Sequence, residues 1–196
     1  MIRTGIFGGS FNPIHKGHLA VAESAINCGL VDETWLMVSP QNPLKVQTQL
    51  LPDSFRLKLA KLATKTIPNV TVSDFEFHLS RPSYTIHTLN ELKKAYPERN
   101  FSLIIGADNW AEFQRWYHYK DILDNYPIVV YPRDGFPINN VDLPNNVTLL
   151  ETSLYNVSST KIREAIKAKK SASRWLPEAV EKELSAFLKQ HPQIWE

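Results

Sequence analysis

The sequence predicts an α/β fold in which one mainly parallel sheet is doubly wound, with helices on both of its faces. Strand-like apolar runs alternate with helical patterns along most of the 196 residues, and such alternation is typical of a parallel sheet. The chain is 43% hydrophobic, which is enough for one buried core. We therefore expect a single domain over residues 1–196, with a small helical C-terminal part from about residue 159.

The predicted strands are short runs rich in β-branched and aromatic residues. In chain order they are Ile2–Phe7, Thr34–Val38, Val70–Val72, Phe101–Ile105, Ile128–Tyr131 and Val147–Leu149. The predicted helices carry apolar residues at helical spacing, as the first does from Leu19 to Ile26. In chain order they are Gly17–Cys28, Ser54–Thr66, Thr85–Ala95, Tyr119–Leu123, Ser159–Lys169 and Pro177–Gln190. We expect Asp53 or Ser54 to cap the second helix, and Ser158 or Ser159 to cap the fifth.

Composition and charge exclude several classes of protein. A formal net charge of +2 is too small to indicate a nucleic-acid partner, and the basic stretch Lys167–Arg174 is expected to be a solvated surface. The single cysteine, Cys28, excludes an internal disulfide and is expected to pack as a small apolar residue. The chain opens on a predicted strand and has no apolar run of membrane-spanning length, so we expect a soluble, cytoplasmic protein with no membrane partner. The sequence leaves open whether it forms a homo-oligomer.

The stretch GGSFNPIHKGH, from Gly8 to His18, indicates a phosphate site. Gly8 and Gly9 are expected to form a tight turn that allows a ligand close to the backbone. His15 and His18 fall at the start of the first predicted helix, where unpaired N–H groups and the helix dipole favour an anion. Imidazoles at this place add donors whose charge is expected to change near neutral pH.

Other interpretations of this stretch are weaker. The two histidines could be ordinary polar residues at a helix start, or a metal pair. A zinc site needs three or four ligands, however, and the other histidines are scattered along the chain. The stretch contains neither the G-x-G-x-x-G pattern of dinucleotide-binding folds nor the G-x-x-x-x-G-K-[ST] pattern of P-loop enzymes.

The same eleven residues resemble the signature of the adenylyltransferase branch of the nucleotidyltransferase superfamily, roughly G-[ST]-F-[DN]-P-x-H-x-G-H. The resemblance implies a Rossmann-like fold that binds ATP through Gly8, Gly9, Ser10, Phe11, His15 and His18. It also implies direct attack of an acceptor phosphate on the α-phosphate of ATP, release of pyrophosphate and no covalent enzyme intermediate. Positioning and charge stabilisation dominate such chemistry. Mg²⁺ is expected because a hard cation must offset the triphosphate charge, and since the sequence shows no carboxylate cage we expect phosphates and water to hold it.

A second element of the same family is found far along the chain. The string from Val157 to Arg163 is similar to the family's [IV]-S-S-T-x-[IL]-R, which grips the ATP triphosphate. From the residues alone, the string indicates a helix capped by Ser159, with exposed basic residues. The resemblance adds contacts with ATP by Ser158, Ser159, Thr160 and Arg163, and a catalytic role for Arg163.

Two further segments are candidates for the same site. In the loop Ser39–Pro52, the resemblance makes Lys45 a catalytic phosphate ligand, whereas a single loop lysine is by default solvated. Asp53 and Arg56 are expected to hold this loop by a cap and an ion pair. After the fourth predicted strand, the family has a G-[AS]-D element beside the nucleotide, which matches Gly106 and Asp108. Asp108 could accept a hydrogen bond from a ribose hydroxyl, cap the next helix, or do both.

Two motifs in the middle of the chain indicate the acceptor. The segment Arg81–Thr85 resembles the P-S-Y-T element of the enzymes of this branch that adenylylate nicotinate mononucleotide, and Phe113–Tyr117 resembles their F-x-x-W-[YK] element. The resemblance implies that Trp116 stacks on the pyridine ring and that Thr85 and the backbone amides around Tyr117 receive the nicotinate carboxylate. It adds Arg133 as an acceptor ligand. The alternative is that Trp116 and Tyr117 are packing aromatics.

The sequence is thus identified as a member of the nicotinate-nucleotide adenylyltransferases, with ATP and nicotinate mononucleotide as substrates and deamido-NAD and pyrophosphate as products. Two departures from the family pattern bear on the acceptor: His87 stands where many relatives carry Asp, and His118 follows the aromatic element. One alternative is an adenylyltransferase for nicotinamide mononucleotide or another phosphorylated cofactor precursor. A second is a catalytically silent module that senses nucleotides. The joint presence of five residues argues against it: His15, His18, Lys45, Ser159 and Arg163.

Overall fold

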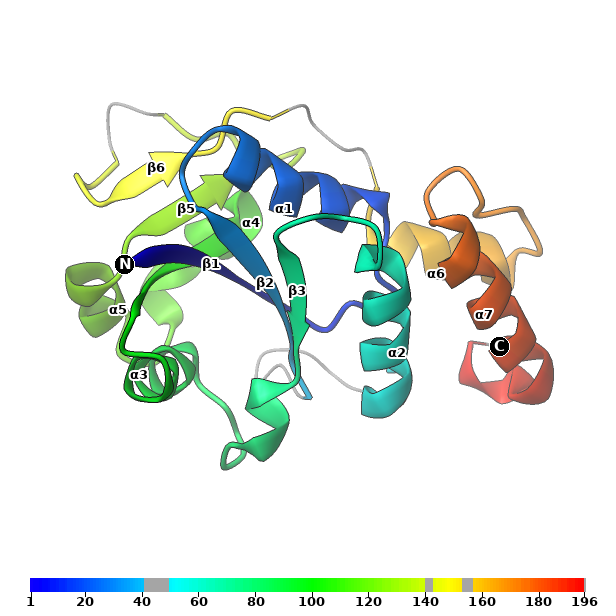
Figure 1. Cartoon of the computed structure of the whole chain (residues 1–196). Helices are drawn as coiled ribbons and strands as arrows, with labels where there is room; N and C mark the ends of the chain where they lie inside the picture. Colours follow the sequence, from blue (N-terminus) through cyan, green and yellow to red (C-terminus); the bar gives the residue numbers. More distant parts are fainter. Residues whose placement is uncertain (41–49, 140–142, 153–156, 196) are drawn as a thin grey trace.

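A six-stranded parallel sheet forms the centre of the computed structural model, which describes residues 1–40, 50–139, 143–152 and 157–195 (Figure 1). The strand order is β3-β2-β1-β4-β5-β6, and every neighbouring pair of strands is parallel. The strands are β1 (Ile2–Gly9), β2 (Glu33–Val38), β3 (Val70–Ser73), β4 (Arg99–Gly106), β5 (Ile128–Tyr131) and β6 (Val147–Leu149). From β1 the chain adds β2 and β3 on one side and then β4, β5 and β6 on the other, so the topological switch point lies between β1 and β4. Ligands of such sheets bind at the carboxyl ends of the strands at this point.

Helices cover both faces of this sheet, as predicted. They are α1 (Lys16–Asn27), α2 (Asp53–Thr64), α3 (Thr85–Ala95), α4 (Ala107–Ala111), α5 (Tyr119–Asn125), α6 (Ser159–Lys167) and α7 (Glu178–Gln190). Short 3-10 turns lie at η1 (Phe75–His78), η2 (Phe113–Arg115) and η4 (Pro192–Ile194). No helix in the described ranges is both long and apolar enough to span a bilayer.

Side chains of successive strand residues divide between two apolar cores. Phe7 packs in the core beneath α1 and α2, whereas its neighbour Ile6 packs in the core beneath α3 and α5. Leu36 and Met37 of β2 divide in the same way. Because side chains alternate across a strand, a strand that is buried on both faces reads as a continuous apolar run. This explains why unbroken runs in the sequence predicted the strands well.

The C-terminal helix α7 packs against α2, and both are labelled in Figure 1. The rings of Phe55 in α2 and Phe187 in α7 are stacked, with centroids 3.9 Å apart. Lys58 and Glu183 form an ion pair at the same contact. Val180 and Leu184 of α7 are buried in the core that also holds the first strand. The helical end of the chain therefore shares its apolar core with the sheet.

Three local predictions are corrected by the structure. Strand β1 continues through Gly8 and Gly9, which pair with Met37 and Val38 of β2, so these glycines are extended and form no turn. The turn comes at Phe11, whose φ is +44°. Helix α2 begins at Asp53 after Pro52, and neither Asp53 nor Ser54 caps it through a side chain. Helix α4, preceded by Gly106, starts before Asp108, so Asp108 is not its cap.

Candidate active site

The histidine motif lies where the switch point of the sheet predicts a ligand site. Strand β1 ends at Gly9, and helix α1 begins at Lys16, with His15 as its N-cap residue. A Cβ on Gly8 would meet no atom within 4 Å, so the backbone there borders open space. The ring of Phe11 is instead buried and packs edge-on against Phe7 and His18. The side chain of Phe11 therefore packs beneath the loop as part of the core, and only the backbone of Phe11 belongs to the loop surface.

The two predicted catalytic histidines are in direct contact. Their rings are stacked, with centroids 3.6 Å apart and an angle of 19° between the planes. The backbone N–H of His15 donates a hydrogen bond to Nδ1 of His18 at 3.2 Å. Since Nδ1 of His18 accepts here, the hydrogen of that ring belongs on Nε2. Nε2 is thus the nitrogen through which His18 can donate to a phosphate oxygen.

His15 has a different environment from His18. Its side chain is 2% exposed, and neither ring nitrogen makes a hydrogen bond of good geometry within the described residues. Burial, together with the positive charge of Arg133, lowers the pKa of His15 from 6.5 to about 3. The expectation that the charge of this histidine changes near neutral pH is therefore wrong, since His15 is neutral there. A neutral imidazole can still donate one hydrogen bond.

The second phosphate motif lies directly against the first. Ser158, the N-cap residue of α6, accepts a hydrogen bond from the backbone N–H of Lys161 at 3.2 Å. Ser159, the other cap candidate from the sequence, does not cap the helix. It donates its hydroxyl hydrogen to the Pro13 carbonyl at 2.9 Å. The α6 N-terminus is thereby fixed on the loop that precedes His15, although the two motifs are about 140 residues apart in sequence.

Arg163 strengthens this connection. Its Nη1 donates to the Asn12 carbonyl at 2.8 Å, and its Nη2 donates to the Thr160 hydroxyl at 3.1 Å. A guanidinium has five N–H donors, so these two bonds leave a second hydrogen on each terminal nitrogen for a ligand oxygen. Partial burial lowers the pKa of Arg163 from 12.5, but a guanidinium remains charged. The two motifs together thus combine a cation, a helix N-terminus and two imidazoles.

A small cleft lies beside the histidines, next to the end of β5. It is lined by Phe7, His15, Gly17, His18, Val21, Tyr131, Pro132, Arg133, Thr152 and Val157. Nε of Arg133 and Oδ1 of Asp108 lie 3.5 Å apart and form an ion pair. Both atoms are buried, and neither has a hydrogen-bond partner in the described part of the chain, so the contact is not a hydrogen bond. A Cβ on Gly106 would come within 2.3 Å of the same Asp108 oxygen. Gly106 therefore allows Asp108 to lie beside the cleft.

The predicted acceptor residues form a separate aromatic cluster. Thr85 is the first residue of α3, and the ring of Tyr84 before it lies 4.5 Å from that of Tyr117. Trp116 packs on Phe113, with centroids 5.5 Å apart, so part of the packing alternative is correct. Its Nε1, however, is buried without a hydrogen-bond partner in the described part of the chain. Tyr117 is 47% exposed.

The structure therefore brings Thr85, Trp116 and Tyr117 into one region at the carboxyl edge of the sheet. The ring of His87 lies edge-on to Tyr84 and Tyr117, 5.8 and 5.6 Å away, so this histidine borders the same cluster. Arg133, predicted as an acceptor ligand, lies instead in the cleft of the histidines. Lys45 is outside the described residues.

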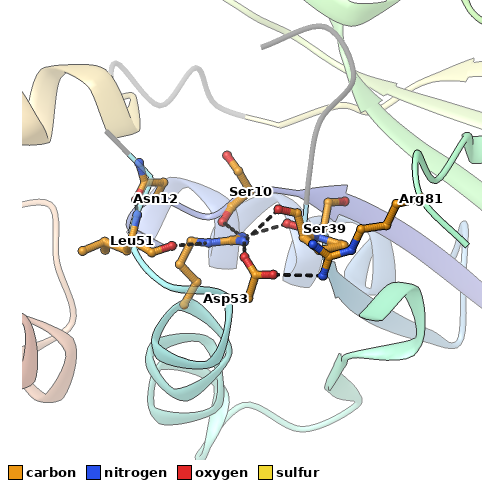
Figure 2. A network of polar contacts seen from close by, with 8 residues as sticks. Ser10, Asn12, Ser39, Leu51, Asp53 and Arg81 are labelled. Carbon is orange, nitrogen blue, oxygen red and sulfur yellow. Dashed lines mark hydrogen bonds and ion pairs between the residues drawn. The ribbon is translucent and has the colours of Figure 1, made fainter. Parts of the chain in front are cut away.

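Sequence reasoning underestimated Arg56. The predicted ion pair with Asp53 is confirmed, with 2.6 Å between Nη2 and Oδ1. The guanidinium also donates to four backbone carbonyls, of which that of Ser10 lies within the motif from Gly8 to His18 (Figure 2). A signal for this was available, because Arg56 falls on the apolar stripe of α2 with Leu59 and Ala63. A cation at a core position of an amphipathic helix indicates a buried polar network.

Comparison with known proteins agrees with this geometry. Residues 6–165 match the family model described as cytidylyltransferase-like. A probable nicotinate-nucleotide adenylyltransferase of Bacteroides thetaiotaomicron is 49% identical over 195 residues, covering 100% of this chain and 90% of the relative. One of Bacteroides fragilis is 52% identical over 182 residues, covering 93% and 90%.

Solved structures show the same fold. The nicotinic acid mononucleotide adenylyltransferase of Plasmodium falciparum, complexed with NaAD, superposes with a TM-score of 0.82 over 96% of this chain and 97% of its own. At 16% identity, this likeness bears on the fold alone. The bacterial relatives reach further, because they are 49% and 52% identical over 100% and 93% of this chain, and the family model matches residues 6–165. The chain belongs to the cytidylyltransferase-like family and, within it, to the nicotinate-nucleotide adenylyltransferases.

Proposed function

We propose that this chain transfers the adenylyl group of ATP to the phosphate of nicotinate mononucleotide, giving deamido-NAD and pyrophosphate. The observation that carries the proposal is the junction of the two phosphate motifs, where Ser159 and Arg163 bond to the carbonyls of Pro13 and Asn12. This junction supports the proposal because it brings the N-terminus of α6 and Arg163 against the loop that precedes His15. An ATP polyphosphate is an anion of the size and charge that such a site can hold.

The chemistry needs no protein nucleophile. An oxygen of the acceptor phosphate bonds to the α-phosphorus of ATP, the bond from that phosphorus to the bridging oxygen breaks, and pyrophosphate leaves with the bonding electrons. The protein positions both phosphates in line and stabilises the negative charge that develops. In our proposal, Nε2 of His18 donates to an α-phosphate oxygen, and Arg163 with the α6 N-terminus holds the departing pyrophosphate.

The neutral state of His15 suits this role. A buried, uncharged imidazole beside Arg133 adds a donor without adding a second buried cation. We propose that Gly8, Gly9 and Ser10 bring backbone to the nucleotide, that Asp108 accepts from its ribose, and that Lys45 adds a further phosphate contact. The ion pair with Arg133 lies beside the cleft, and the carboxylate oxygens of Asp108 are hydrogen-bond acceptors.

The aromatic cluster is the proposed acceptor pocket. Trp116 would stack on the pyridine ring, which is cationic in a mononucleotide and so is attracted to an aromatic face. Thr85 opens a helix of eleven residues, whose N-terminus favours the nicotinate carboxylate. Tyr117 is exposed beside it and borders the same space. An acid would be preferred to an amide on this basis.

Magnesium is proposed to enter with ATP, since it neutralises part of the triphosphate charge. Among the described residues, no three side chains of His, Cys, Asp or Glu gather in a way that could hold a metal ion. Mg²⁺ keeps several waters and binds readily through phosphates, so the donor set suits an ion carried by the triphosphate. His18 and Arg163 would then bind phosphate oxygens, and phosphate oxygens and water, not side chains, would hold Mg²⁺.

Pyrophosphate release from ATP and magnesium tests the proposal, with nicotinate mononucleotide, nicotinamide mononucleotide and phosphopantetheine offered separately. We expect strong preference for the first. Preference for another acceptor would keep the phosphate site and refute the assignment of Thr85, Trp116 and Tyr117. If folded protein bound ATP and released no pyrophosphate with any of the three, the chain would be a nucleotide-sensing module instead.

A further inference from the structure

A buried guanidinium connects the segments around the nucleotide motif. The side chain of Arg56 has no exposed area. Its Nε donates to the Leu51 carbonyl at 3.0 Å, and its Nη1 donates to the carbonyls of Ser10 and Ser39 at 2.5 and 2.9 Å. Its Nη2 donates to Asp53 at 2.6 Å and reaches the Pro40 carbonyl at 3.5 Å. All five N–H donors of the guanidinium are therefore engaged.

These acceptors belong to three different segments, as Figure 2 shows around the labelled Ser10, Ser39 and Leu51. Ser10 lies in the loop after β1, Ser39 follows β2, and Leu51 precedes α2. Two bonds outside the guanidinium reinforce the connection. The Leu51 N–H donates to the Asn12 side chain at 3.0 Å, and the Ser39 N–H donates to the Gly9 carbonyl at 2.9 Å.

A charge buried in this way is costly unless it is paired. Burial lowers the pKa of Arg56 from 12.5, and the hydrogen bond and charge of Asp53 oppose that effect. Asp53 is thus the counter-ion of the network. Because a planar five-donor fork meets five acceptors, lysine with its three donors cannot replace Arg56.

The counter-ion has a second partner on the acceptor side. The other carboxylate oxygen of Asp53 lies 3.3 Å from Nη2 of Arg81, which is half exposed. Arg81 begins the segment Arg81–Thr85, which leads into α3 and the aromatic cluster. The carboxylate of Asp53 therefore bonds both to Arg56, which holds the loop after β1, and to Arg81, in the segment that carries the proposed acceptor residues.

A second connection runs in parallel through the protein interior. Glu76, which is 7% exposed, accepts hydrogen bonds from the hydroxyls of Thr88 at 2.9 Å and of Ser39. Thr88 lies one turn after the start of α3, and Ser39 is one of the acceptors of Arg56. The start of α3 is thus connected to the hydrogen-bond network of Arg56 in two ways: through the half-exposed Arg81 and through the buried Glu76.

We propose that Asp53 is a positioning residue that couples the two substrate sites, by holding Arg56 under the nucleotide loop and Arg81 beside the acceptor pocket. In-line transfer needs both phosphates at a set separation, and small misplacements at that point cost rate. The inference rests on the proposed function only in assigning the acceptor to the aromatic cluster. Neither Asp53 nor Arg81 is proposed to touch the reacting atoms.

The test is a double-mutant cycle on KM for both substrates with Asp53→Asn, Arg81→Ala and the double variant. We expect Arg81→Ala to raise KM for the acceptor about threefold, the size expected for a half-exposed ion pair, with KM for ATP and Tm unchanged. Asp53→Asn should raise KM for ATP as well as KM for the acceptor, since it also removes the charged partner of Arg56. The double variant should match Asp53→Asn alone, and Arg81→Lys should retain the wild-type acceptor KM.

Arg3→Ala is the matched control, because Arg3 is similarly exposed and pairs with Asp32 at the opposite end of β1. It should leave both KM values unchanged. An unchanged acceptor KM in Arg81→Ala would overturn the proposal. So would effects of Asp53→Asn and Arg81→Ala that multiply, since Arg81 would then contact the acceptor directly. If the wild type used a different acceptor, the proposed function would fail, and the same cycle run with that acceptor would still decide the coupling.

Discussion

Acid should destabilise this fold through His15. The unfolded chain takes up a proton at His15 near its usual pKa of 6.5, whereas burial, with the charge of Arg133, holds the pKa of the folded chain at about 3. The stability contributed by the neutral histidine is therefore complete above pH 6.5 and is lost as pH falls from there toward 3. Replacing His15 with a side chain that does not titrate should remove this part of the pH dependence.

The size of the effect follows from proton linkage. A proton bound only by the unfolded chain changes the free energy of unfolding by about 1.4 kcal/mol for each pH unit. Since the change begins near pH 6.5 and is not complete until about 3, the loss between pH 7 and pH 5 is about 2 kcal/mol. Other titrating groups shift the curves of wild type and variant alike, so the difference between the two curves isolates His15.

Urea unfolding of wild type, His15→Gln and His15→Asn at pH 7, 6 and 5, followed by tryptophan fluorescence, measures this difference. Each variant has its own packing cost, which is constant with pH. We expect the advantage of the wild type over both variants to shrink by about 2 kcal/mol from pH 7 to pH 5. Curves that stay parallel would refute the argument, and a change in only one of the two variants would attribute the effect to packing.

Four further predictions concern single side chains. His18→Ala should lower kcat by about 100-fold and change the KM of the acceptor little in steady-state assays, because its donor matters most as charge develops; unchanged turnover would exclude the assigned role. Trp116→Ala should raise the KM of the acceptor by about tenfold, and an unchanged KM would mean a packing role alone. Glu76→Gln should gain stability relative to wild type in urea unfolding as pH rises above 4.5, because burial raises the pKa of Glu76 and its ionised form is disfavoured; a constant difference would contradict this. Gly106→Ala should lower Tm and activity together, since its Cβ would collide with Asp108 and overpacking costs about 1 to 3 kcal/mol, whereas a fully active variant would show that Asp108 is free to move.

The fold was largely predictable because the central strands are buried on both faces over most of their length and so form largely apolar runs. The errors came where pairing overrides local preference. Gly8 and Gly9 have the composition of a turn, yet β2 offers partners at Met37 and Val38, and the ladder extends through both glycines. Conversely, the turn occurs at Phe11, a residue type that seldom adopts positive φ and is held there by its buried ring.

The site was predictable as far as its motifs and no further. Sequence resemblance grouped the string around Ser159 with the histidine motif, but it could not tell that Ser158 is the cap and that Ser159 bonds instead to Pro13. These roles depend on how α6 meets the loop after β1, which is a property of tertiary packing. Arg56 was harder still, since four of its acceptors are backbone carbonyls and leave no mark in side-chain composition.

The histidine pair shows why a motif alone does not assign roles. His15 and His18 are three positions apart, stack on one another and have the same side chain, so a sequence pattern treats them alike. The structure separates them: His15 is buried with a pKa of about 3, whereas Nδ1 of His18 accepts a backbone hydrogen bond that directs its hydrogen to Nε2. Environments that differ in this way divide tasks between like residues. We therefore expect the rate of transfer to depend mainly on His18 as a donor, with the neutral His15 packed against it as a second donor.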